Sequence, residues 1–196
     1  MRFSAPGTTL AAALVALAVV PAPAPAQAAA PPPRGETAAA REQARLCERL
    51  DGEEAVAACR EALALGIGPA RRGAVRQLLS LRLATLERWE ELGALLRESV
   101  QLDPGDAVAW QRLGGVLLFG LGRPADAVSA LEEAVRLAPG EAPAQVDLAV
   151  ALASAGRLPE AVAAFDAAAR LDPAVLDSRP AARAALAAAR EGRRWP

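Results

Sequence analysis

One pattern of small and large apolar residues occurs twice in this chain, about 34 residues apart. The first copy comprises Trp110, Leu113, Gly114, Leu117, Ala127, Leu131, Ala134 and Pro139, and the second comprises Gln145, Leu148, Ala149, Leu152, Ala161, Phe165, Ala168 and Pro173. A fixed period of this length is typical of solenoid proteins, in which each repeat buries its apolar face only by stacking on its neighbours. The pattern therefore predicts a scaffold with an extended surface, and binding as its activity.

The composition allows one domain and argues against several kinds of chemistry. The chain has 196 residues, 53% of them hydrophobic, and its formal net charge is −1, so no large positive field favours nucleic acid. It has no His and no Lys, which removes the usual general bases and Schiff-base nucleophiles. It also lacks a phosphate-binding glycine loop and a metal-ligand motif. We therefore predict that the protein is not an enzyme and needs no metal, cofactor or nucleic-acid partner.

Residues 1–28 have the features of a secretory signal peptide. Arg2 provides positive charge, Leu10–Val20 is an apolar run of 11 residues, and Ala26–Ala28 fits an A-x-A cleavage site. This run is shorter than the roughly 20 apolar residues that a membrane-spanning helix needs. We predict cleavage of the signal peptide, an Ala/Pro-rich linker at 29–35 and no membrane span afterwards, in a periplasmic or secreted protein. A retained interfacial anchor is the alternative.

Helical spacing of apolar residues, together with turn signals, divides the rest of the chain into five segments. We predict a degenerate helical hairpin at 36–69, a degenerate repeat at 73–106, two well-formed repeats at 107–140 and 141–174, and a capping helix at 178–192. In the 73–106 segment, Leu92 replaces the small residue that lets two helices approach closely. This hairpin is therefore expected to be packed more loosely than the others or at a different angle.

The repeated spacing resembles that of the tetratricopeptide repeat family. The resemblance is good over 107–140 and 141–173, moderate over 73–106 and weak over 36–69. It implies an all-α solenoid of stacked antiparallel helix hairpins, a right-handed superhelix and a concave groove that commonly holds a partner's peptide. The chain departs from the family pattern in two ways, because the first strong copy has one extra residue near Leu121 and no Tyr occupies the usual aromatic sites.

The resemblance also implies which residues line the groove, namely the outward positions of each first helix. These positions are Gln77, Leu78, Leu81, Gln111, Arg112, Gly115, Phe119, Val146, Asp147 and Val150. Most of them are apolar, which favours an apolar partner segment, either extended or helical, with Arg112 and Asp147 setting its orientation. Arg112 is the one cation in this set, so the cationic cluster with which some family members grip a terminal carboxylate is not expected. Alternatively, the groove is filled by the chain's own N-terminal hairpin or by a second copy.

Cys47 and Cys59 are the only cysteines of the chain, and one falls on each helix of the first predicted hairpin. In an exported protein an even pair predicts a disulfide. Two buried free thiols and a redox-active pair are the alternatives, although eleven residues separate the cysteines and no His supports thiolate chemistry.

The sequence thus favours a non-enzymatic scaffold or adaptor outside the cytoplasm, with a protein or peptide as its partner. The alternative is a structural component of an envelope complex that self-associates into a homo-oligomer, through the groove or through Trp195 near the end of the chain.

Overall fold

The computed structural model describes residues 36–195 of the chain, so the predicted signal peptide and linker lie outside the described residues. The described part contains α-helices and one π-helical turn, and no strand. In chain order these are α1 (Ala38–Arg49), α2 (Gly52–Ala64), α3 (Pro69–Thr85), α4 (Trp89–Leu102), α5 (Ala107–Gly115), the π-helical turn η1 (Val116–Gly120), α6 (Pro124–Leu137), α7 (Ala142–Ala155), α8 (Leu158–Leu171) and α9 (Pro180–Arg190). None of these helices is both long enough and apolar enough to cross a bilayer.

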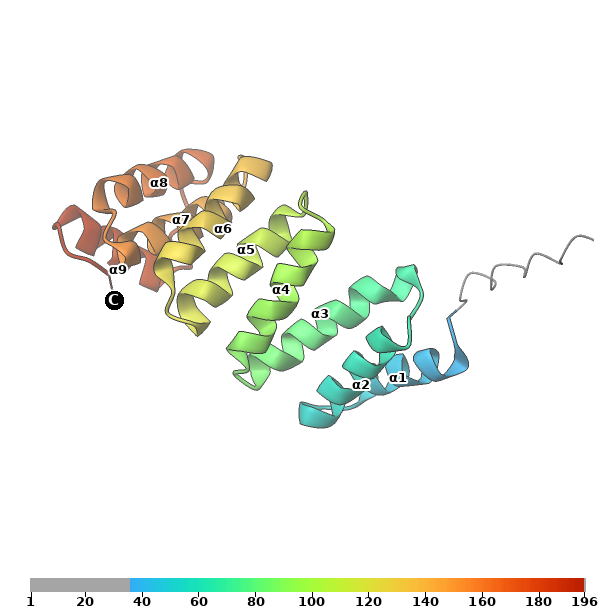
Figure 1. The fold of residues 1–196 in the computed structure, drawn as a ribbon. Coiled ribbons are helices and arrows are strands. Elements are labelled where there is room, and N and C mark those ends of the chain that lie inside the picture. The colour runs from blue at the N-terminus through green and yellow to red at the C-terminus, as the bar shows by residue number, and fades with distance from the viewer. Residues whose placement is uncertain (1–35, 196) are drawn as a thin grey trace, which may run out of the picture. The chain divides into compact units, whose positions relative to one another are not determined.

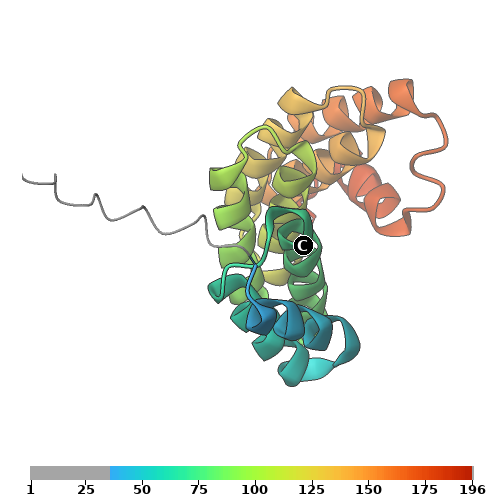
Figure 2. The ribbon, with the colours of Figure 1, turned by 90° about the vertical axis from the view of Figure 1, so that its right-hand side faces the viewer.

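Consecutive helices pack against one another from α1 to α9, which makes the described part a solenoid of helix hairpins (Figures 1 and 2). The pairs α1/α2, α5/α6 and α7/α8 are closely packed, and α9 covers the end of the array by packing on both α7 and α8. One core runs through the array, and Leu83, Leu131 and Phe165 are among its largest fully buried side chains. The predicted all-α solenoid with a C-terminal capping helix is confirmed.

The contact between α5 and α6 explains why the first strong copy has Gly114 at its small position. A Cβ atom added to Gly114 would lie 2.8 Å from Cδ2 of Leu131 and closer still to its Cγ. Leu131 is fully buried and cannot move away into solvent. Glycine at this position therefore lets the backbone of α5 lie directly on a large side chain of α6.

The turns inside three hairpins have the same sequence of conformations: a residue with left-handed backbone angles is followed by an arginine. Gly122 and Gly156 have φ angles of 59° and 83°, a region that glycine enters at little cost. The same position in the α3–α4 turn is held by Glu87, with φ at 54°. In each turn the arginine then binds a carboxylate three residues further along, in the pairs Arg88–Glu91, Arg123–Asp126 and Arg157–Glu160. The α3–α4 hairpin thus keeps the turn of the strong repeats but has a strained residue in it.

The α3–α4 hairpin is also the most open. Among the helix hairpins of the described part, α3 and α4 make the fewest contacts, and they diverge from their shared turn (Figure 1). Leu92 of α4 is buried at the position that Ala127 and Ala161 hold in α6 and α8. Because the leucine side chain is larger, it keeps the two helices apart. The loose packing expected from the sequence is therefore observed, and it leaves apolar side chains of this hairpin uncovered.

Candidate binding groove

An apolar groove with a volume of about 700 Å³ opens between α3, α4, α5 and η1, and we call it the α3–α5 groove. Its lining residues are Ala74, Gln77, Leu78, Ser80, Leu81, Ala84, Trp89, Leu92, Leu96, Arg112, Gly115, Val116, Phe119 and Gly120. Leu81 and Phe119 are 59% and 69% exposed, whereas Leu92 and Leu96 are buried beneath the groove. Large apolar side chains that remain exposed around a concave surface usually mark a binding site.

The extra residue of the first strong copy forms the η1 side of this groove. The N–H of Leu121 donates to the carbonyl oxygen of Val116 at 3.0 Å, a hydrogen bond that spans five residues instead of four. Such a π-helical turn accommodates one inserted residue within an otherwise α-helical segment, and it often occurs at functional sites. Here Leu117 and Leu118 are buried while the next side chain, Phe119, is exposed in the groove.

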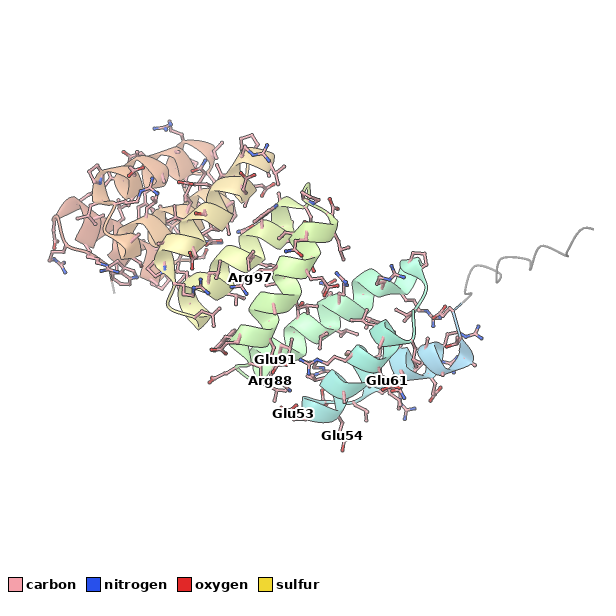
Figure 3. All side chains as sticks on the ribbon, in the orientation of Figure 1. Glu53, Glu54, Glu61, Arg88, Glu91 and Arg97 are labelled. Atoms are coloured by element: carbon pink, nitrogen blue, oxygen red, sulfur yellow. A yellow bond between two sulfur atoms is a disulfide. The ribbon has the colours of Figure 1, made fainter. Side chains whose placement is uncertain are left out.

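Trp89, the first residue of α4, contributes an aromatic ring to the groove next to η1. A Cβ atom added to Gly120 would lie 2.8 Å from two atoms of the indole ring of Trp89, so the ring lies against the bare backbone of η1. The preceding residue, Arg88, binds Glu53 of α2 and Glu91 of α4 (Figure 3). The pair with Glu53 links the residue before Trp89 to α2, and the pair with Glu91 links it to the first turn of α4.

Glu91 is the centre of this ion-pair cluster. Its carboxylate accepts hydrogen bonds from Arg88, at 2.5 Å, and from Arg60 of α2. The hydrogen bond from Arg88, followed by that from Arg60, lowers the pKa of Glu91 to about 2. The carboxylate therefore stays ionised in all but strongly acidic solution, and α4 stays tied to α2 although it packs loosely on α3.

Six of the predicted groove residues come together in the α3–α5 groove, namely Gln77, Leu78, Leu81, Arg112, Gly115 and Phe119. No residue of α1 or α2 lines the groove, so the N-terminal hairpin does not fill it. Sequence reasoning did not assign Trp89, Leu92 and Leu96 of α4 to the groove. The sequence feature that could have identified these α4 residues is Leu92. A large residue at a position where the other repeats have a small one separates the two helices and uncovers the side chains between them.

The prediction that Val146 and Val150 line the groove is wrong. They are only 1% and 4% exposed and belong to the core. The physical reason is that α9 packs on α7, so that most residues of α7 are buried on every side. The sequence contains a signal for this burial, because residues 142–155 are apolar almost all the way round the helix, as is typical of a helix with no solvent-facing side.

Gln111 and Asp147 were expected to face a partner, but they bind each other and the C-terminal region. The Nε2 of Gln111 donates to Oδ2 of Asp147 at 2.6 Å, and Arg179, which precedes α9, lies 2.7 Å from Oδ1 of Asp147. Both oxygens of this carboxylate therefore have partners within the chain. Asp147 is not available to orient a bound segment, and this part of the prediction is wrong.

Cys47 and Cys59 lie at disulfide distance and join α1 to α2. Their sulfur atoms are 2.02 Å apart, their Cα atoms are 4.7 Å apart, and both residues are fully buried. The bond closes the first hairpin next to the turn at Asp51 and Gly52. Elsewhere between residues 36 and 195, no three His, Cys, Asp or Glu side chains cluster as metal ligands would.

Comparison with known proteins supports the repeat over part of the chain. The family model described as tetratricopeptide repeat matches residues 112–175, which include α6, α7 and α8. A comparison with curated protein sequences gives no match.

Several solved structures have a similar fold. MamA (residues 41 to the end) from Desulfovibrio magneticus RS-1 is 21% identical, with a TM-score of 0.62, over 81% of this chain and 93% of that one. YrrB, described as a TPR protein with an unusual peptide-binding site, is 23% identical, with a TM-score of 0.58, over 79% and 75%. The TPR2AB domain of yeast Sti1, in its pHSP90 complex, is 15% identical, with a TM-score of 0.52, over 77% and 69%. The chain thus has the helical solenoid fold of these proteins, and its residues 112–175 match the tetratricopeptide repeat.

Proposed function

We propose that this protein is a non-enzymatic scaffold that binds an apolar segment of another protein in the α3–α5 groove. The observation that carries the proposal is the groove itself, a volume of about 700 Å³ lined by apolar side chains from three helices and η1. Burying exposed apolar surface such as Leu81 and Phe119 stabilises a complex by about 25 cal/mol for each Å² removed from water. The groove therefore offers both the shape and the driving force for binding.

The similar folds support the same kind of activity. YrrB is described by its peptide-binding site, and the Sti1 domain is described in a complex with pHSP90. Both show that a solenoid of this architecture can present a surface for a peptide or a protein. In this chain, the groove between α3 and α5 is the surface that has this role.

We also propose that the protein works outside the cytoplasm, in the periplasm or as a secreted protein. Residues 1–28 have the sequence of a signal peptide, with the apolar run Leu10–Val20 before a cleavage motif. Cys47 and Cys59 at disulfide distance support an oxidising compartment, in which such bonds form and persist. The alternative is a self-associating envelope component, in which the same groove or Trp195, near the end of the chain, contacts a second copy.

Replacing Phe119 or Leu81 by aspartate is expected to weaken partner binding about thirtyfold or more, because each change puts a charge where an apolar contact is buried. The partner is first identified by co-purification from the native envelope fraction and mass spectrometry, and is then titrated in pure form by calorimetry. Leu102→Asp is the matched control, since Leu102 is 66% exposed and lies outside the groove.

All three variants should keep the circular dichroism spectrum of the wild type, because the replaced side chains are exposed. Wild-type affinity in both Phe119→Asp and Leu81→Asp would show that the groove is not the binding site. Light scattering distinguishes partner binding from self-association. If the wild-type chain forms dimers and Phe119→Asp converts them to monomers, self-association is the function of the groove.

A further inference from the structure

We infer that the ligand of the α3–α5 groove is a single amphipathic helix that carries a carboxylate and lies between α3 and α5. This inference rests on the proposed function and names the partner's chemistry.

The first helices of neighbouring hairpins touch at two places in the described array but not at the third. α1 contacts α3, and α5 contacts α7, whereas α3 and α5 make almost no contact. The groove occupies the space between α3 and α5. A helix bound there would restore the side-by-side contact that the other first helices make.

Each wall of the gap presents side chains at helical spacing. On α3, Ala74, Leu78 and Leu81 follow one another at intervals of four and three residues. On the opposite wall, Arg112, Val116 and Phe119 repeat the same intervals along α5 and η1. Such rows form the ridges and grooves into which another helix packs, using its own residues at i, i+3 or i+4, and i+7.

The groove has too few polar groups to accept an extended segment. The polar side-chain groups of its lining are the amide of Gln77, the hydroxyl of Ser80, the indole N–H of Trp89 and the guanidinium of Arg112, and the hydroxyl of Ser80 already donates to the carbonyl oxygen of Arg76 at 2.8 Å. No asparagine occurs anywhere in the chain. An extended segment would bring backbone N–H and C=O groups into this apolar space without partners, which is costly. A helix pairs these groups internally and enters without that cost.

Arg112 supplies the charge preference. It is exposed at the groove, and no carboxylate lies within ion-pair distance of it among residues 36–195. A carboxylate on the bound helix would give Arg112 its partner, and a charge-assisted hydrogen bond of this kind also fixes the direction of the helix.

The test is a selection of random 16-residue peptides, displayed on phage, on the full wild-type chain, with removal of peptides that also bind the Phe119→Asp variant. We expect the enriched peptides to carry apolar residues at i, i+3 or i+4, and i+7, together with Asp or Glu. An alternating apolar pattern, or enrichment of proline-rich peptides, would overturn the helical ligand and leave the proposed function standing. Equal recovery on wild type and variant would contradict both.

Two measurements on one enriched peptide, made by synthesis, sharpen the result. Proline at a central solvent-facing position should weaken its binding at least tenfold more than alanine at that position, because proline breaks a helix. Arg112→Gln should weaken binding about tenfold, and removal of the peptide's carboxylate should then have no further effect. Equal binding of the proline and alanine peptides overturns the helix, and an unchanged affinity in Arg112→Gln overturns the role of the carboxylate.

Discussion

Gly114→Ala is expected to lower the free energy of unfolding by about 1–2 kcal/mol, because overpacking costs about 2–3 kcal/mol and the better helix propensity of alanine offsets only about 1 kcal/mol of it. The new methyl group would lie 2.8 Å or less from two carbon atoms of Leu131, which is fully buried and has no space to move into. Overpacking then exceeds the gain in helix propensity. The position thus tests whether the close contact of α5 and α6 determines the repeat.

Gly115→Ala is the matched control, because it lies in the same helix one residue later and has open space where its Cβ would be. We expect it to raise the stability by up to about 1 kcal/mol. Urea unfolding followed by circular dichroism measures both variants. In a Leu131→Ala background the cost of Gly114→Ala should shrink, since the clashing side chain is gone. Two glycine variants with effects of the same sign would show that Gly114 is not a packing position.

The second large effect is expected at the disulfide. Reduction of the bond between Cys47 and Cys59 should lower the free energy of unfolding of the first hairpin by about 3 kcal/mol, the chain-entropy value for a loop of this size. The two residues are separated by 12 positions in the sequence and are fully buried. Among the described helices, α1 packs only on α2 and α3, so few other contacts compensate for the loss.

Urea unfolding with and without a reductant measures this effect, and the double variant Cys47→Ala/Cys59→Ala is the control. The free energy of unfolding of this variant should be close to that of the reduced wild type, with a small further loss for the missing sulfur atoms. The reductant should not change the stability of the variant. A thiol assay on the protein purified from its native host and then unfolded should detect no free cysteine. Two free thiols, or a wild-type free energy of unfolding that does not change when the reductant is added, would contradict the presence of the disulfide.

The solenoid itself could be predicted from the sequence because the repeat encodes it redundantly. Ala127 and Ala161, for example, are both small, both fully buried and both followed four residues later by a large core side chain. One sequence suffices to predict this fold because both repeats place small and large residues at the same positions. The open packing of the α3–α4 hairpin could also be predicted, because Leu92 is large where the two strong repeats have alanine.

The groove could be predicted only in part, because its position depends on contacts between distant segments. The burial of Val146 follows from the docking of α9, about 35 residues further along the chain, and the periodicity of α7 alone does not reveal which helix covers it. The extra residue near Leu121 was visible as an irregular spacing. Whether it would form a loop or a π-helical turn depends on the packing of Leu117 and Leu118 in the core.

The most direct test of the binding groove is site-specific photo-crosslinking in the native host cells. A photoreactive phenylalanine analogue is placed at position 119, inside the groove, or at position 102, outside it, where the natural side chains are 69% and 66% exposed. We expect a single protein adduct from position 119, attached through an amphipathic helix of the partner, and no such adduct from position 102. An adduct of equal yield from both positions, or from position 102 alone, would contradict binding in the α3–α5 groove.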